Sequence, residues 1–260
     1  MSMVRNSARE RLAAGELAIG VGVRLARTVE IGKLMQGCGY DWMLIDLEHG
    51  TISLDTVSQI SIAALDAGIA PIVRVPHDEY AMAARAIDGG ALGIIMPHVD
   101  TADQAKHTVA QLKYPPLGHL SAGGVMPQSG FKPVRGAEAA LAMNETILLA
   151  VMLETPAAIA NADAIAAVPG IDIVMIGTND LMMEMGVGGN PDHPDVNKAY
   201  ATMIAACHRH NKWPGMGGVH RDESMGTYVK MGAHFILTTS DLALLVAQAT
   251  QREKFVRGLK

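Results

Sequence analysis

Several acidic, basic and imidazole side chains stand directly after short apolar runs in this sequence. The clearest run, residues 43–45, ends in Asp46-Leu47-Glu48-His49. Similar runs end at Arg74, at Glu154 and shortly before Asp180. An apolar run that stops abruptly at polar side chains is typical of a buried β-strand with functional groups at its carboxyl end. We therefore expect a catalytic or metal-binding centre where these strand ends meet.

Glu154 and Asp180 follow two successive expected strands, and neighbouring strands lie about 4.8 Å apart. Two carboxylates at adjacent strand ends can converge on one ion. A site with carboxylates and no cysteine favours a hard divalent cation such as Mg²⁺ or Mn²⁺, which acts as a Lewis acid on an oxygen-rich substrate. The alternative is structural: Glu154 would cap the helix after it, and Asp180 would lie in a first helical turn.

Arg74, His49 and Asp88 are further candidates, each with a structural alternative. A guanidinium at a strand end can bind a substrate carboxylate with two hydrogen bonds, or pair with an acid of the protein. An imidazole at such a rim suits a general base or proton carrier, although single histidines are often structural. Asp88 stands before Gly89-Gly90, where the local pattern indicates an exposed acid at a helix end.

Apolar strands alternate with helices along the chain. The expected strands are residues 17–23, 42–47, 71–75, 92–97, 147–154, 172–177, 215–219 and 234–238. The expected helices are residues 4–14, 27–37, 51–67, 79–88, 100–112, 135–144, 156–167, 179–185, 195–211, 221–231 and 241–255. Residues 114–133 interrupt this rhythm with a stretch rich in Gly, Pro and Ser, which is typical of a lid or binding loop.

The strands are continuous apolar runs, as expected for parallel strands covered on both faces. Eight such strands in 260 residues predict a single α/β domain, residues 1–260, of the (β/α)8 TIM-barrel class, which typically takes ~250 residues. A doubly wound sheet is the main alternative, but the sequence has neither GxGxxG after the first strand nor GxxxxGK[ST]. The polar residues just after strands also favour a barrel; they are Asp46, Glu48, His49, Arg74, His98, Glu154, Asp180, His220 and Asp241.

Composition excludes several classes of partner. The net charge is −5, aromatic residues make up 4% of the chain, and no basic stripe is present, so we expect no nucleic acid partner. No apolar run is long enough to span a bilayer or to act as a signal peptide, so we expect no membrane partner and a cytoplasmic location. Cys38 and Cys207 lack the spacing of a zinc site and are expected to stay reduced.

Taken together, the motifs resemble the metal-dependent, pyruvate-using aldolases of the HpcH/HpaI family. The resemblance covers nearly the whole chain and rests on ordered motifs: Asp46-Leu47-Glu48-His49, Val73-Arg74, Tyr114-Pro115-Pro116-Leu117-Gly118, Glu154-Thr155, Ile176-Gly177-Thr178-Asn179-Asp180-Leu181 and Gly189-Asn190-Pro191-Asp192-His193-Pro194. The best-known member cleaves 4-hydroxy-2-oxoheptanedioate in bacterial aromatic catabolism. The resemblance implies a carbon–carbon lyase on a phosphoenolpyruvate/pyruvate-type barrel. This lyase would reversibly cleave 4-hydroxy-2-oxo acids to pyruvate and an aldehyde through a metal-stabilised pyruvate enolate.

The resemblance also implies roles for individual residues. Glu154 and Asp180 would bind Mg²⁺, Mn²⁺ or Co²⁺, and Arg74 would bind the pyruvate carboxylate. His49 would be the acid–base residue and Asp88 would orient it. Three further expectations follow from the resemblance: backbone groups around Gly177 and Thr178 would line the pyruvate site, Asp46 and Glu48 would support the rim, and the C-terminal helix, residues 241–257, would pack on a neighbouring subunit of a homo-hexamer built as a dimer of trimers.

The chain departs from the family pattern near these motifs. His119-Leu120-Ser121 stands where many relatives carry Arg-Gly, Met152-Leu153-Glu154 replaces Gln-Ile-Glu, and Gly177-Thr178-Asn179-Asp180 replaces Gly-Pro-Ala-Asp. The ligands are retained, so the departures bear on which aldehyde is used.

Three rival functions remain open from the sequence. A Schiff-base aldolase would need a lysine at a strand end, whereas the lysines lie in expected helices, loops or tails. A citrate-lyase-like enzyme using coenzyme A would need a basic patch near the strand ends, beyond Arg74, Arg85 and Arg135. The third rival is a non-catalytic barrel that binds a metal or another partner, and the set formed by Glu154, Asp180, Arg74 and His49 argues against it.

Overall fold

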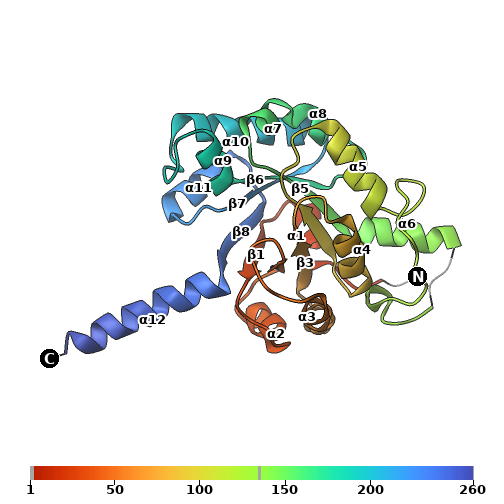
Figure 1. Cartoon of the computed structure of the whole chain (residues 1–260), viewed down its shortest axis with the longest axis horizontal. Helices are drawn as coiled ribbons and strands as arrows, with labels where there is room; N and C mark the ends of the chain where they lie inside the picture. Colours follow the sequence, from red (N-terminus) through yellow and green to blue (C-terminus); the bar gives the residue numbers. More distant parts are fainter. Residues whose placement is uncertain (1–2, 134–135, 260) are drawn as a thin grey trace.

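The computed structural model describes residues 3–133 and 136–259, and its strands form a closed parallel barrel. Helices surround this barrel (Figure 1). The strands are β1 (Ala18–Val23), β2 (Trp42–Asp46), β3 (Ala70–Arg74), β4 (Gly93–Met96), β5 (Leu148–Leu153), β6 (Ile173–Gly177), β7 (Trp213–Gly217) and β8 (Phe235–Ser240). Each strand pairs with the next one along the chain, and β8 pairs with β1. The predicted (β/α)8 barrel is confirmed.

Helices follow the strands as the sequence predicts, with differences in their bounds. They are α1 (Ser7–Ala13), α2 (Glu30–Gly37), α3 (Leu54–Ala67), α4 (Tyr80–Asp88), α5 (Ala102–Leu112), α6 (Gly136–Thr146), α7 (Pro156–Ala160), α8 (Ala162–Ala166), α9 (Thr178–Glu184), α10 (Pro194–Arg209), α11 (Asp222–Met231) and α12 (Asp241–Arg257), with a short 3-10 helix, η1 (Pro127–Ser129). Residue 135, the expected start of one helix, lies outside the described residues.

Two expected elements differ from the structure. The helix predicted for residues 156–167 is broken at Asn161, whose side-chain amide donates to the Asp100 carbonyl oxygen at 2.8 Å. Strand β7 starts at Trp213, ahead of the predicted residue 215. Pro214 suggests a turn because it has no N–H, but its carbonyl oxygen still accepts from the His234 N–H at 2.9 Å. Both errors arise from contacts between segments that are distant in sequence.

The barrel interior is filled near the amino ends of the strands. Trp42 stacks on Phe235 with ring centroids 3.9 Å apart, and its indole N–H donates to the Ala18 carbonyl oxygen at 3.1 Å. Gly20 makes room for this indole, because a Cβ at that position would lie 2.1 Å from the Trp42 ring. Packing here stabilises the barrel and leaves the carboxyl ends of the strands for the site.

The irregular segment 114–133 does not form a lid over the site of its own protomer. The side-chain amide of Gln128 donates to the carbonyl oxygens of Ile87 and Ala91, at 2.6 and 3.0 Å. The backbone carbonyl oxygen of Gln128 accepts from the Val4 N–H. Ile87 and Ala91 precede β4, at the amino-terminal end of the barrel. Tyr114 is also buried. Buried side chains anchor this segment at the opposite end, so the expected lid is absent from this cavity, and a role as a binding loop stays a prediction.

Helix α12 projects away from the barrel and carries the C-terminus far from the other helices (Figure 1). None of its described residues is buried, and its exposed apolar side chains include Leu245, Val246, Phe255 and Val256. Exposed apolar groups along a whole helix are unusual for an isolated monomer.

Among the helices that the structure describes, we find none with both the length and the apolar character needed to cross a membrane.

Candidate active site

A cavity of about 330 Å³ opens at the carboxyl ends of the strands. Its floor includes the apolar side chains Leu44, Met152 and Leu237. Its polar wall contains Arg24, Asp46, His49, Arg74, Glu154, Thr178, Asn179, Asp180, His220, Thr239 and Ser240. Except for Asp88, every predicted site residue, including Gly177, lines this one cavity.

Glu154 is one of two buried acids of the cavity, and like Asp46 it has only 1% of its surface exposed. Its Oε2 accepts from the His98 backbone N–H at 2.8 Å and lies 3.1 Å from His98 Nδ1. Burial raises the pKa of the Glu154 carboxyl to about 8; the His98 N–H opposes this rise, and the negative charge of Asp180 adds to it. The protein itself therefore supplies too little positive charge nearby to hold Glu154 in its charged form.

The space around Glu154 fits a divalent cation. A Cβ on Gly177 would lie 2.4 Å from Glu154 Oε1, so this glycine keeps the space beside the carboxylate clear. Asp180 follows in the first turn of α9 and lines the same cavity. No group of three or more His, Cys, Asp or Glu side chains suited to a metal occurs within residues 3–133 and 136–259. A cation held by two carboxylates would keep positions for water and substrate oxygens, as Mg²⁺ usually does.

Arg74 is bound by acids of the protein. Its Nε and Nη2 donate to Asp46 Oδ1 and Oδ2, at 3.0 and 2.8 Å. Its Nη1 lies 3.0 Å from Glu48 Oε2. Register explains the first pair, because Asp46 and Arg74 are partners on β2 and β3. Each terminal nitrogen of a guanidinium carries two hydrogens, so each keeps one for a substrate.

Asp46 also organises the segment that carries His49. Its Oδ1 accepts from the backbone N–H groups of Glu48 and His49, at 3.1 and 3.2 Å. Burial disfavours the charged form of Asp46, but the hydrogen bonds and positive charge of Arg74 outweigh burial and hold the pKa of this carboxyl below its ordinary value. Asp46 is therefore a charged anchor for both Arg74 and the His49 turn.

The structure does not bring Asp88 to His49 within one protomer. The His49 side chain is half exposed, and its Nε2 lies 3.9 Å from Glu48 Oε2. Asp88 ends α4, and its carboxylate lies near Gly123 of the irregular segment, outside the cavity. Orientation of His49 by Asp88 remains a prediction, and it would require the Asp88 of a neighbouring protomer.

Thr178 positions the loop that leads to Asp180. Its buried hydroxyl donates to the Gly217 carbonyl oxygen and lies 2.7 Å from the Tyr200 hydroxyl. Tyr200 in turn stacks on Tyr228 with ring centroids 3.7 Å apart. The side chain of Thr178 is thus committed to the protein, and only its backbone is left for a ligand.

Two residues of the site were not predicted from the sequence. His98 was noted only as a polar residue after a strand, yet it holds Glu154 through its backbone and contacts it through its ring. It does so with φ at 53°, in the left-handed region that non-glycine residues rarely adopt. Arg24, which directly follows β1, was overlooked although it occupies the same rim. The rule of polar residues after strand ends could have found Arg24.

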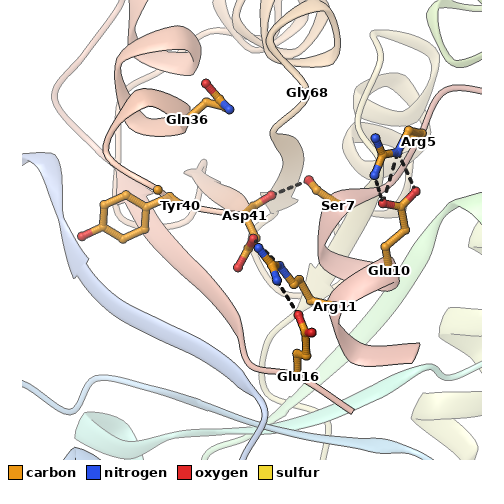
Figure 2. A pocket seen from close by; sticks show the side chains of 10 residues that line it. Arg5, Ser7, Glu10, Arg11, Glu16, Gln36, Tyr40, Asp41 and Gly68 are labelled. Carbon is orange, nitrogen blue, oxygen red and sulfur yellow. Dashed lines mark hydrogen bonds and ion pairs between the residues drawn. The ribbon is translucent and has the colours of Figure 1, made fainter. Parts of the chain in front are cut away.

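A second hollow, of about 400 Å³, lies at the amino ends of β2 and β3. Figure 2 shows that its charged side chains point toward one another. Arg5 pairs with Glu10, and Arg11 pairs with both Glu16 and Asp41. These exposed pairs satisfy their own charges, so we assign no chemistry to this hollow.

Comparisons with known proteins agree with this geometry. The family model described as HpcH/HpaI aldolase/citrate lyase matches residues 23–247. A 4-hydroxy-4-methyl-2-oxoglutarate aldolase of Hapsidospora irregularis is 35% identical over 257 residues, covering 96% of this chain and 94% of that protein. A 4-hydroxy-2-oxo-heptane-1,7-dioate aldolase of Salmonella typhimurium is 32% identical over 247 residues, covering 95% and 92%.

A solved structure of an HpcH/HpaI aldolase from Desulfitobacterium hafniense has a TM-score of 0.91 at 30% identity, and the match covers 98% of this chain and 97% of that one. The resemblance predicted from the motifs is thereby confirmed. This chain belongs to the HpcH/HpaI aldolase/citrate lyase family.

Proposed function

We propose that this protein is an aldolase that reversibly cleaves 4-hydroxy-2-oxo acids to pyruvate and an aldehyde. The observation that carries this proposal is the buried Glu154 carboxylate, with its raised pKa, beside Asp180 in the cavity that also contains Arg74 and His49. Such a set can bind a cation, a carboxylate and a transferable proton at one place.

Glu154 and Asp180 would hold the cation, for which Mg²⁺, Mn²⁺ and Co²⁺ are the candidates. When bound, such an ion supplies Lewis-acid stabilisation for negative charge that develops on the keto oxygen of the substrate. The remaining N–H groups of Arg74 would bind the substrate carboxylate, while Asp46 holds the guanidinium in place. Backbone groups of Gly177 and Thr178 would border the pyruvate half of the substrate.

His49 would handle the proton in the cleavage direction. It takes the proton of the 4-hydroxyl group as the C3–C4 bond breaks, and the electron pair of that bond moves to C3. The products are an aldehyde and the enolate of pyruvate, which then takes a proton at C3. The reverse sequence forms the carbon–carbon bond.

The substrates named for the two relatives support this substrate class. Both names, 4-hydroxy-4-methyl-2-oxoglutarate and 4-hydroxy-2-oxo-heptane-1,7-dioate, describe 4-hydroxy-2-oxo acids that carry a second carboxylate. We propose that the chain acts on an acid of this type. The identity of the second product, an aldehyde or, from an acid methylated at C4, a ketone, is the point for experiment.

The test is a synthesis panel of pyruvate with several aldehydes, run with chelator and with each of the three ions. We expect a 4-hydroxy-2-oxo acid only when a divalent ion is present. Product that forms undiminished after exhaustive chelation would refute the proposal. Trapping of a substrate–lysine adduct by borohydride would refute it as well; no lysine among the described residues lines the cavity.

We also propose that α12 packs on a neighbouring protomer, in a homo-hexamer built as a dimer of trimers. The absence of buried residues over the described part of α12, with Leu245, Val246 and Phe255 exposed, supports a partner for this helix. The same assembly would allow a neighbouring Asp88 to approach His49.

Light scattering after size-exclusion chromatography tests this assembly. The double substitution Leu245→Glu and Val246→Glu should lower the molar mass, since charges would be placed on the apolar surface. Gln248→Glu, on the same helix, adds a charge without removing an apolar group and should leave the mass unchanged. A monomeric wild-type protein would contradict the proposed assembly.

A further inference from the structure

Arg24 is a cation on the cavity wall that has no part in the roles described so far. It directly follows β1, which lies opposite β5 in the closed ring of eight strands. The cavity therefore has Arg24 on one side and Glu154, at the end of β5, across from it. Thr239 of β8, which pairs in register with Val21 of β1, is a polar neighbour on the same side.

The guanidinium of Arg24 is held in place but incompletely used. Its Nη2 donates to the His49 carbonyl oxygen at 3.0 Å. Its Nε lies 3.5 Å from Asp46 Oδ2, and this buried nitrogen makes no hydrogen bond within the described residues. A guanidinium has five N–H donors, and within the described residues only one of those of Arg24, on Nη2, makes a hydrogen bond, so the terminal nitrogens keep donors for a ligand.

An ion pair with Asp46 does not explain why an arginine stands at position 24. Its two oxygens already accept four hydrogen bonds, two from Arg74 and one each from the backbone N–H groups of Glu48 and His49. Arg74 alone supplies a close, two-bond ion pair to this carboxylate. The longer approach of Arg24 thus adds little to the stability of Asp46.

The backbone at Arg24 is fixed by an acid from the other end of the chain. Asp241, the first residue of α12, accepts from the backbone N–H groups of Arg24, Leu25 and Ala26, with closest distances of 2.9, 3.0 and 2.7 Å. A cation on a fixed backbone at a cavity rim is suited to ligand binding, because little ordering is needed when the ligand arrives.

We propose that Arg24 binds a second carboxylate, on the part of the substrate that leaves as the aldehyde. This inference rests on the proposed function, in which His49 acts at the 4-hydroxyl group. Arg24 hydrogen bonds to the backbone of His49, so its guanidinium would face the part of a bound substrate that lies beyond C4. Arg24 is then the residue that selects dianionic over monoanionic 4-hydroxy-2-oxo acids.

Calorimetric binding to the Mg²⁺-loaded enzyme tests this assignment. The probes are 2-oxoglutarate and 2-oxoadipate, each a 2-oxo acid with a second carboxylate, and 2-oxobutyrate and 2-oxopentanoate, which lack it. The variants are Arg24→Gln, Arg24→Lys and the control Arg85→Gln, which removes a positive charge from the exposed face of α4.

We expect wild-type enzyme to prefer at least one of the diacids. Arg24→Gln should weaken its binding about 10- to 100-fold, as for loss of a charged hydrogen-bond partner, and change the monoacids by less than about 3-fold. Arg24→Lys should recover part of the loss, and Arg85→Gln should show none. Equal weakening of both classes, or no preference in the wild type, would overturn the inference.

Exchange of the pyruvate methyl protons with solvent, followed by NMR in the same variants, separates this inference from the proposed function. Exchange at the wild-type rate in the control Arg85→Gln, together with a preference for diacids that is lost only in Arg24→Gln, is the expected pair of results. Absence of exchange in the wild type would refute the aldolase proposal, while a diacid preference that depends on Arg24 would still support the anion site.

Discussion

Two charged clusters occupy opposite ends of the barrel, and they differ in how completely their groups are paired. At the amino end, the Lys113 ammonium donates to the carbonyl oxygens of Asn144 and Ile147 and to Asp172, at 3.0, 2.7 and 3.0 Å. Asp172 also accepts from Arg9 and from the Leu149 N–H. An ammonium has three hydrogens to donate, so Lys113 has no donor left for a ligand.

At the carboxyl end, the cluster is left incomplete. Glu154 is buried with a raised pKa, His49 is half exposed, and Arg24 has a buried nitrogen without a hydrogen-bond partner in the described chain. Burial alone does not distinguish the two clusters, because Lys113 is as deeply buried as Glu154. The difference lies in the central group of each cluster. Lys113 has all its donors paired, although Arg9 Nε beside it is buried without a hydrogen bond, whereas Glu154 makes no ion pair with an arginine or lysine of the described residues. The paired cation stabilises the fold, and the unpaired acid is the group suited to a ligand.

Glu154→Gln should have the largest effect on activity. Loss of one metal ligand removes several kcal/mol of transition-state stabilisation, and about 4 kcal/mol corresponds to about 10³-fold in kcat/KM. The amide still accepts from the His98 N–H, so the Tm of the metal-free protein should change by less than about 2 °C. Glu184→Gln, an exposed change on α9, is the matched control. A fully active Glu154→Gln enzyme would contradict the assignment of Glu154 as a metal ligand.

Lys113→Met should show the opposite pattern. Removing the ammonium leaves Asp172 with only Arg9 as a charged partner, together with two unpaired carbonyl oxygens, and should lower the free energy of unfolding by about 3 kcal/mol. The folded fraction should keep its kcat. Denaturant titration measures the loss, with Lys106→Met, an exposed residue on α5, expected to cost less than about 0.5 kcal/mol. A fully stable Lys113→Met protein would contradict the role given to this cluster.

Asp46→Asn tests an acid of the carboxyl-end cluster that, unlike Glu154, is well paired. Because the pKa of Asp46 is lower in the folded protein than its ordinary value, the charged carboxylate stabilises the fold above that ordinary value. This contribution fades as the pH falls through the lower pKa of the folded state. The substitution should cost about 2 kcal/mol at pH 7, since Glu48 still faces Arg74, and less at acidic pH.

Urea titrations at several pH values measure this difference. Asp66→Asn, an exposed position on α3, is the control and should leave the pH dependence of stability unchanged. An Asp46→Asn protein whose loss of stability grows toward acidic pH would show that the sign is wrong.

His98→Asn should have the smallest effect. Asparagine tolerates the left-handed backbone of this position and keeps the N–H that donates to Glu154, but it removes the imidazole nitrogen 3.1 Å from Glu154 Oε2. Loss of such a supporting contact should weaken Mn²⁺ binding about 10-fold, which calorimetry can measure. His107→Asn on α5 should leave Mn²⁺ affinity unchanged, and an unchanged affinity in His98→Asn would leave the ring without a positioning role.

The sequence was informative where local pattern decides the structure. Continuous apolar strands, each followed by a polar residue, predicted both the barrel and the rim, because parallel strands place all their carboxyl ends on one side. Glu154, Asp180, Arg74 and His49 were found in this way, and they line one cavity. The structure caps α7 with Thr155 rather than Glu154, but it places Asp180 in the first turn of α9, so the metal pair stays a prediction.

Features that depend on distant contacts could not be read from the sequence. The pairing of Arg74 with Asp46 follows from the register of β2 and β3, and the 114–133 segment is held by contacts of Gln128 with α4 and the chain start. The proposed contact of Asp88 with His49 involves a second protomer. Arg24 was not predicted because the glycines of β1, which precede it, indicate close packing rather than a strand that ends at a functional group.

The most direct test of the proposed metal ligands, Glu154 and Asp180, is the exchange of pyruvate methyl protons in deuterated buffer. NMR follows this exchange without any aldehyde present. We predict no exchange above background in chelator-treated enzyme, and exchange that is restored by Mg²⁺ or Mn²⁺ in the wild type but not in Glu154→Gln. Equal exchange with and without the divalent ion would contradict the assignment of Glu154 and Asp180.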